Sequence, residues 1–176
     1  MIRPAIAADV DGIAAVQARG WQAAYRGIVP EATLRNVTVE NRSKMWAGAR
    51  LGTRAPEWPV FVAEWDGAVV GMAAMGPPRD QGFHYDAELY ALYVDPGQWR
   101  RGIGRALFIR CVRDAWAQGS RSLYLWVFVA NRPARQFYER MGGTPLEERV
   151  RDLDMDGTPV PELPYGWPSL PVTLLG

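Results

Sequence analysis

Thiol and imidazole side chains are nearly absent from this chain of 176 residues, which holds one cysteine, Cys111, and one histidine, His84. A single cysteine excludes an internal disulfide. One histidine and one cysteine leave no ligand set for a metal site of the usual kind. The sequence therefore predicts no metal site, and it fits a reducing, cytoplasmic location.

Long apolar runs and an excess of charge are also missing. The formal net charge is +1, so the chain has no bulk attraction to nucleic acid or to a membrane surface. No apolar stretch reaches the roughly 18 residues that a membrane-spanning helix needs, and residues 1–5 do not open a signal peptide. Small molecules are the expected partners, and any anion site must be local.

What is present predicts one mixed α/β domain over residues 1–176. Strands are expected at residues 1–5, 60–65, 68–75, 85–94, 122–129, 144–155 and 159–175. Helices are expected from the capping residue Asp9 to about Gly27, after Pro30, at 39–50, at 102–118, and from Asn131 to Gly142. Asp66-Gly67 and Asp156-Gly157 predict hairpin turns. The strand–helix–strand unit 85–129 predicts a parallel pair with a right-handed crossover.

The segment Trp99 to Leu107 has the composition of an anion-binding loop. It follows a strand that ends at Asp95-Pro96, and it precedes a helix. The first amides of a helix have no intrahelical partner and carry partial positive charge. Gly102 and Gly104 allow a phosphate close to the backbone. The surrounding arginines, Arg100, Arg101 and Arg105, add positive charge.

Two common phosphate motifs do not fit this loop. A P-loop requires Gly-Lys followed by Ser or Thr, which the chain lacks. A dinucleotide fingerprint requires a third small residue where this chain has Leu107. The remaining pattern, Arg/Gln-x-x-Gly-x-Gly/Ala, cradles a coenzyme A pyrophosphate. The alternative is an ordinary glycine-bearing helix start with solvated arginines.

Three blocks in order resemble the GCN5-related N-acetyltransferase (GNAT) family. Residues 88–96 (ELYALYVDP) resemble its fourth strand, residues 101–104 (RGIG) its pyrophosphate loop, and residues 131–143 (NRPARQFYERMGG) its last helix. The resemblance covers essentially the whole chain and is densest from Glu88 to Leu146. In one departure, Trp99 replaces the usual Arg or Gln, so Gln98 or Arg100 is expected to supply the missing polar contact.

The resemblance implies a mostly antiparallel sheet of about seven strands with a splayed parallel central pair, about four flanking helices, and acetyl-CoA as acetyl donor. The backbones of Leu92 and Val94 should bond the pantetheine arm, as should Asn131, and the amides from Arg101 to Ala106 should hold the pyrophosphate. The implied cofactor residues are Leu92, Tyr93, Val94, Arg100, Arg101, Gly102, Ile103, Gly104, Arg105, Ala106, Asn131, Ala134 and Phe137.

Acetyl transfer requires a neutral amine and benefits from a proton donor for the departing thiolate. Tyr138, at the family's tyrosine position, is the candidate general acid. Glu88 is the candidate general base, because strand alternation predicts one face for Glu88, Tyr90, Leu92 and Val94. A water chain is the alternative base, and Asp86 is a weaker rival. His84 is expected to be a loop residue, and Cys111 a packed one.

The family resemblance places the acceptor pocket between the first two helices and the late hairpin. The implied substrate residues are Trp21, Tyr25 and Glu31. Residues 21–30 resemble a GNAT branch that includes polyamine acetyltransferases, so a small cationic amine is the favoured acceptor. Three readings stay open: a small amine, a protein N-terminus or lysine, and a non-catalytic acetyl-CoA sensor. The apolar segment 164–175 suggests a possible homodimer.

Overall fold

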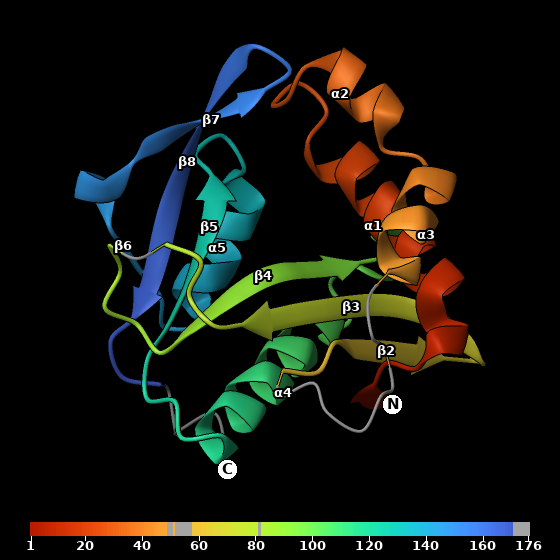
Figure 1. Ribbon diagram of the computed structural model, residues 1–176, viewed down its shortest axis with the longest axis horizontal. Coiled ribbons are helices and arrows are strands. Elements are labelled where there is room, and N and C mark those ends of the chain that lie inside the picture. The colour runs from red at the N-terminus through yellow and green to blue at the C-terminus, as the bar shows by residue number, and fades with distance from the viewer. Residues whose placement is uncertain (49–50, 52–57, 81, 171–176) are drawn as a thin grey trace.

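The computed structural model describes residues 1–48, 51, 58–80 and 82–170. Within them, one eight-stranded sheet forms the centre of the molecule (Figure 1). The strand order is β1-β2-β3-β4-β5-β8-β6, and β7 pairs with β8. The strands are β1 (Ile2–Pro4), β2 (Phe61–Trp65), β3 (Ala68–Gly76), β4 (Ala87–Val94), β5 (Leu123–Phe128), β6 (Thr144–Pro145), β7 (Arg151–Met155) and β8 (Thr158–Trp167).

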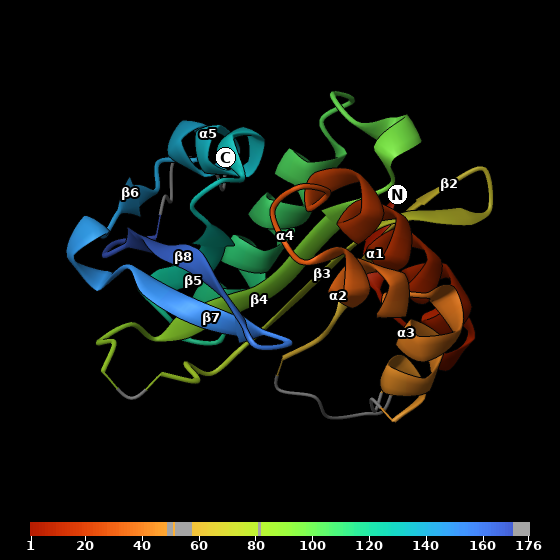
Figure 2. The ribbon, with the colours of Figure 1, turned by 90° about the horizontal axis from the view of Figure 1, so that it is seen from above.

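Helices cover both faces of this sheet (Figure 2). They are α1 (Val10–Ala24), α2 (Glu31–Asn36), α3 (Val39–Ala47), α4 (Ile103–Ala117) and α5 (Arg132–Arg140), with short 3-10 turns at Ala7–Asp9, Pro96–Gln98 and Glu147–Arg149. Leu107, Phe108 and Cys111 of α4 pack into the larger core, while Ile13 and Val16 of α1 pack on the opposite face. No helix in the described residues is long and apolar enough to cross a membrane.

Two tight turns follow directly from their residues. Asp66 and Gly67 have φ angles of 48° and 74°, and Asp156 and Gly157 have 53° and 82°. Two successive left-handed residues are the geometry of a type I′ turn, which Asp-Gly adopts readily. Both predicted hairpins, β2–β3 and β7–β8, are confirmed.

The predicted parallel pair is confirmed, but it is short. β4 and β5 are in register only at Ala87 with Leu123 and at Glu88 with Tyr124. Beyond these residues β4 pairs with β3 alone, and β5 pairs with β8 alone. Figure 1 shows β5 turning away from β4, which opens a V between the two strands.

A β-bulge in β4 changes which side chains share a face. The β3–β4 register passes from Ala74–Ala91 to Met75–Leu89, so Tyr90 is an extra residue. Leu89 precedes the bulge and Leu92 follows it, yet both pack against the α4 core. Glu88 therefore lies on the opposite face from Leu92 and Val94. The prediction that Glu88 shares a face with Leu92 and Val94 is wrong, because the extra residue in the bulge reverses which side chains point to each face.

Two other expectations need correction. The Asp9 carboxylate does not cap α1, because it accepts from the Arg3 guanidinium at 2.7 and 2.9 Å and from the Ile6 amide at 2.8 Å. The strand predicted at 144–155 is two strands separated by the turn Glu147–Arg149. The expected mixed, mostly antiparallel sheet with a parallel central pair is confirmed, and the described residues form eight strands and five α-helices. The last two residues of the predicted helix 39–50, the end of the predicted strand 159–175 from residue 171, and most of the loop 53–59 lie outside the described residues.

Gly76 leaves space for the bulge. A Cβ there would lie 2.7 Å from two ring carbons of Tyr90 and would also meet its hydroxyl, which donates to the Pro77 carbonyl at 2.6 Å. We expect Gly76→Ala to lower the free energy of unfolding by about 1–3 kcal/mol, the usual range for overpacking. Urea denaturation measures this. Gly48→Ala is the control, because its Cβ would approach only a carbonyl oxygen, at 3.8 Å. Equal midpoints for both variants would show that Tyr90 moves without cost.

Candidate active site

A cleft of about 720 Å³ opens where β4 and β5 separate. Both strands, α1, α5 and the loop before α4 contribute to its lining. The predicted site residues that line it are Tyr25, Leu92, Tyr93, Val94, Arg100, Gly102, Ile103, Gly104, Arg105, Asn131, Ala134, Phe137 and Tyr138. The structure therefore brings most of the predicted residues into one cavity. Trp21, Glu31, Glu88, Arg101 and Ala106 are not among the residues that line it.

The loop before α4 forms a cradle of open backbone amides. Arg100 and Gly102 have left-handed φ angles of 63° and 79°, the kind of backbone that forms anion-binding concavities. The first intrahelical bond runs from the Ala106 amide to the Gly102 carbonyl at 2.9 Å. The amides of Ile103, Gly104 and Arg105 therefore have no intrahelical acceptor. Ala106 was predicted to contribute its amide, but that amide is already bonded.

Trp99 changes the strand end beside this cradle. Its indole N–H donates to the Val94 carbonyl at 2.8 Å, and 47% of the residue is exposed. The Val94 carbonyl was predicted to bond pantetheine, and it already accepts this hydrogen bond from the protein. The neighbouring Gln98 lines the cleft, and its side-chain oxygen is buried without a partner among the described residues. This oxygen can only accept a hydrogen bond, so a contact of Gln98 with a phosphate would use its amide nitrogen, and that contact stays a prediction.

Asn131 fixes the start of α5 at the other wall. Its side-chain oxygen accepts from the Ala134 amide at 3.3 Å, which caps the helix. The residue is 7% exposed and lines the cleft. Because the oxygen is used for capping, the amide nitrogen is the part of Asn131 left for a ligand. Its bond to pantetheine stays a prediction.

Tyr138 presents a buried phenol in the cleft. Its ring packs edge-on against Phe137, with centroids 5.2 Å apart. No hydrogen bond to its hydroxyl is found among the described residues, and burial raises the pKa of Tyr138 well above the ordinary value of a phenol. Tyr138 is therefore neutral at physiological pH and holds a proton that it can donate.

Three other tyrosines, Tyr25, Tyr90 and Tyr93, share the lining with Tyr138. The hydroxyls of Tyr25 and Tyr93 lie 3.4 Å apart, and burial raises the pKa of both. Among the described lining residues there is no carboxylate and no imidazole. The cleft thus offers proton donors but no group that titrates near neutral pH.

Glu88 lies behind the cleft wall and not in it. It is 1% exposed, and its carboxylate accepts from the Arg79 backbone amide at 2.8 Å, from Arg79 Nε at 3.0 Å and from Arg79 Nη2. The Tyr124 hydroxyl adds a fourth bond, at 2.8 Å. Every lone pair that faces the protein is engaged, so the general-base role of Glu88 stays a prediction that this geometry does not support.

The other titratable candidates also lie away from the cleft. Asp86 accepts from the amides of Arg121 at 2.7 Å and Ser122 at 3.1 Å, and these bonds lower its pKa. His84 is exposed on the loop before β4. Cys111 is fully buried in α4, where burial raises the pKa of its thiol. None of the three lines the cleft.

The acceptor residues predicted on α1 and α2 separate into two groups. Tyr25 lines the cleft, and its ring packs edge-on against Trp21 at 4.8 Å and Phe128 at 5.0 Å. Trp21 lies behind it, with the Arg42 guanidinium 5.0 Å from its ring centroid. Glu31 is exposed and does not reach the cleft. Of the three, only Tyr25 is in place to touch a ligand.

Comparisons with known proteins agree with this geometry. The model of the acetyltransferase (GNAT) family matches residues 21–143. The chain belongs to the GNAT acetyltransferase family. It is 31% identical over 172 residues to the N-acetyltransferase YuaI of Bacillus subtilis, covering 96% of this chain and 93% of that protein.

Two further relatives were found in Salmonella typhimurium. An L-methionine sulfoximine/L-methionine sulfone acetyltransferase is 32% identical over 113 residues, which is 62% of each chain. The solved structure of an acetyltransferase, yncA, with its cofactor acetyl-CoA superposes with a TM-score of 0.71 at 24% identity, covering 97% of this chain and 93% of that one. The second likeness is one of fold.

As a GNAT acetyltransferase, the protein uses acetyl-CoA as its donor, and the cradle fits the donor's pyrophosphate. Three open amides and the lining arginines Arg100 and Arg105 supply hydrogen bonds and positive charge. A Cβ on Gly104 would lie 3.7 Å from Leu92 and Phe137, in the gap between the two walls. When bound, acetyl-CoA supplies the acetyl group as an activated thioester.

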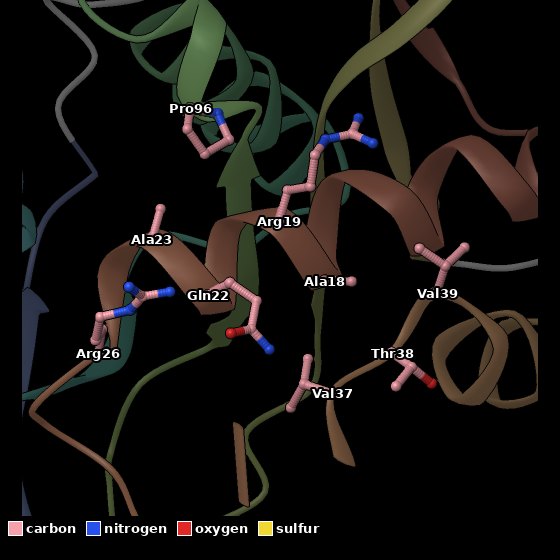
Figure 3. Close-up of a pocket in the computed structure, with 9 residues that line it drawn as sticks. All are labelled: Ala18, Arg19, Gln22, Ala23, Arg26, Val37, Thr38, Val39 and Pro96. Carbon is pink, nitrogen blue, oxygen red and sulfur yellow. The ribbon is translucent and has the colours of Figure 1, made fainter. Parts of the chain in front are cut away.

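A second hollow, of about 730 Å³, lies on the outer side of α1 (Figure 3). Arg19 and Gln22 line it, but the Arg19 guanidinium bonds the Asp95 carboxylate at 2.7 Å, and the Gln22 amide donates to the Leu34 carbonyl at 2.6 Å. Among their lining residues, the two cavities share only Ala23. Arg19 and Gln22 are thus engaged within the protein, and none of the predicted site residues lies here.

Gly104 gives a direct test of the cradle. Gly104→Glu would place bulk and negative charge among the open amides, so we expect acetyl-CoA affinity to fall by about 100-fold or more. Isothermal titration calorimetry measures it. Gly48→Glu adds the same charge at the end of α3, away from the cleft, and should bind as the parent does. Unchanged affinity in Gly104→Glu would mean that the phosphate site lies elsewhere.

Proposed function

We propose that the protein transfers the acetyl group of acetyl-CoA directly to the primary amine of a small molecule, with Tyr138 as proton donor. One observation carries this proposal. The hydroxyl of Tyr138 lies without a protein partner in the same cleft as the open amides of the phosphate cradle. A donor site and a proton source thus share one cavity, as group transfer requires.

Direct transfer is favoured because the chain lacks a usable nucleophile. Cys111 is the only cysteine, it is fully buried in α4, and burial keeps its thiol protonated. An acyl-cysteine route needs an accessible thiolate. The acceptor amine therefore attacks in a ternary complex, and Tyr138 protonates the departing sulfur.

The proton on the amine sets a condition on the acceptor. The described lining has no carboxylate and no imidazole, so the amine loses its proton to water. An alkylamine has a pKa near ~10.4, whereas an α-amine in a peptide has one of about 7.7–8.0. At neutral pH, the neutral form of this peptide α-amine is more abundant than that of the alkylamine by a factor of about 200–400. The amine of a free α-amino acid lies between the two, because the carboxylate beside it favours the ammonium form. This favours an acceptor whose amine has a lowered pKa.

The acceptor side is bounded in a way that favours a small molecule. The Thr33 hydroxyl of α2 donates to the Asp156 carboxylate in the β7–β8 turn at 2.6 Å. Beneath this bond, Val29 and Leu34 pack with Phe128 and Val160. Figure 2 shows the hairpin tip reaching α2. Such a bridge leaves less room for a protein chain than an open groove would.

The charges near the cleft argue against a polycation. Its charged lining residues are Arg100, Arg105 and Arg140. The acids Asp80 and Glu162 are both paired with Arg151, and Glu88 is paired with Arg79. The polyamine-like acceptor stays a prediction, because the described lining offers no carboxylate to pair with its positive charges. An α-amino compound fits better, and L-methionine sulfoximine, named for one relative, is a compound of that kind.

The acceptor class is tested by release of free thiol from acetyl-CoA with a panel of α-amino acids, methionine analogues, spermidine, an aminoglycoside and short peptides. We expect an α-amino acid or analogue to exceed spermidine in kcat/KM by about tenfold or more at neutral pH. Preference for spermidine would restore the polyamine reading. Preference for peptides would favour a protein acceptor. Silence, with acetyl-CoA still raising the melting temperature, would indicate a sensor.

The role of Tyr138 is tested by Tyr138→Phe, which removes only a hydroxyl. We expect kcat to fall by about 10²–10⁴-fold, the usual size of acid catalysis. Acetyl-CoA affinity, measured by calorimetry, should stay within about twofold, because the ring still packs against Phe137. A large loss of affinity with unchanged kcat would instead make Tyr138 a packing residue.

A further inference from the structure

Among the described residues, Glu88 is the one buried carboxylate that joins β4 to β5, and the proposed reaction does not use it. It belongs to β4 and is directly opposite Tyr124 of β5, at the last point where the two strands are paired. The Tyr124 hydroxyl donates to Glu88 Oε2 at 2.8 Å in a buried hydrogen bond. A side-chain bond thus reinforces the backbone pairing at the vertex of the V.

From this vertex, contacts lead to both walls of the cleft. On one side, Arg79 bonds Glu88, and its guanidinium lies 4.4 Å from the ring centroid of Tyr90, the bulged residue that lines the cleft. On the other side, Tyr124 is two residues before Trp126, which also lines the cleft. The Arg79 side chain is 62% exposed, while that of Glu88 is 1% exposed. The carboxylate is thus the buried centre, and the arginine covers it from outside.

The loop between β3 and β4 is tied to the same point. Phe83 stacks on Tyr124, with centroids 4.6 Å apart and rings 12° from parallel. The Asp80 amide donates to the Tyr124 hydroxyl at 3.4 Å, and the Asp80 carboxylate accepts from the Trp126 indole at 3.0 Å. Burial and the bond to Glu88 raise the pKa of Tyr124, so it remains a donor. These contacts hold the wall beside Trp126.

The vertex is also the reacting end of the cleft. The phosphate cradle at Gly102–Arg105 marks one end, and Tyr90 and Trp126 lie two residues beyond the paired Glu88 and Tyr124. If the donor's phosphates occupy the cradle, its thioester reaches toward Tyr90 and Trp126. A displacement of these residues of about 1 Å is enough to cost up to about 100-fold in rate.

We propose that Glu88 is a positioning residue: with Arg79 and Tyr124 it forms a clasp that sets the separation of β4 and β5 at the reacting end. It does not act as the base. A base must reach the amine, whereas this carboxylate accepts four bonds from the protein and faces away from Leu92 and Val94. The proposal rests on the acetyltransferase function given above.

The experiment compares Glu88→Gln, Tyr124→Phe and the double variant. Tyr124→Phe removes the donor of the shared bond, and Glu88→Gln replaces one of the two acceptor oxygens with an NH2 group that faces donors. Each should therefore lower kcat by about tenfold, and the double variant should be within about twofold of the worse single variant. Acetyl-CoA affinity, set mainly at the cradle, should change less than about threefold by calorimetry. The pH profile of kcat/KM should keep its shape in all three, because neither residue exchanges a proton with the substrate in this proposal.

Tyr165→Phe is the matched control. The Tyr165 hydroxyl also joins a carboxylate and an arginine, at 2.7 Å from Glu139 and 3.2 Å from Arg135, but it lies outside the cleft lining. It should change the melting temperature without changing kcat. Melting curves for every variant show whether the protein is folded, and Tyr124→Phe keeps the test open if Glu88→Gln does not fold.

Two results overturn the clasp. If Glu88→Gln loses about 10²-fold or more together with the acidic limb of its pH profile, while Tyr124→Phe behaves as the parent, Glu88 is the base. If neither variant changes kcat, the contacts serve stability alone. A parent enzyme that binds acetyl-CoA but turns over no amine in the panel would instead contradict the proposed function, which is a separate outcome.

Discussion

The short pairing of β4 and β5 is the constraint on which the rest of the site depends. After two paired residues the strands separate, and their facing edges lose the hydrogen bonds that a sheet would supply. Each strand remains anchored on its other side, β4 to β3 and β5 to β8. Unpaired backbone groups in a cavity are costly unless something satisfies them. An extended ligand that carries amides can do so, and it also fills the space between the walls.

The V persists because both walls are held independently. Leu89 and Leu92 are packed against α4, while Tyr165 and Trp167 anchor β8 in the same core. The α1–α2 segment then spans the opening through Tyr25, which touches Phe128 of β5 and approaches Tyr93 of β4. Closing the V by pairing β4 with β5 would break these contacts. Side-chain packing therefore keeps the cleft open, and the backbone groups on the facing edges of β4 and β5 are left without sheet partners.

Local features of the site were predictable from the sequence, and non-local ones were not. The Asp-Gly turns, the end of α4, predicted at residue 118 and found at Ala117, and the cradle at Gly102–Arg105 depend on a few adjacent residues, so their patterns suffice. The face of Glu88 was mispredicted because the bulge at Tyr90 depends on space left by Gly76, across the sheet. Asp9 was assigned as a cap, but Arg3 and Ile6, outside the helix, hold its carboxylate.

Burial explains why the cleft holds an acid but no base. A neutral phenol loses little in an apolar cavity, and burial strengthens its hold on the proton, as at Tyr138. An ionised carboxylate in the same place would need partners to offset its desolvation. Glu88 has such partners, four donors in all, and they are what keep it from acting on a ligand. In the proposed reaction, the burial that keeps Tyr138 protonated and the lack of a carboxylate or imidazole in the described lining together mean that the amine loses its proton before it attacks.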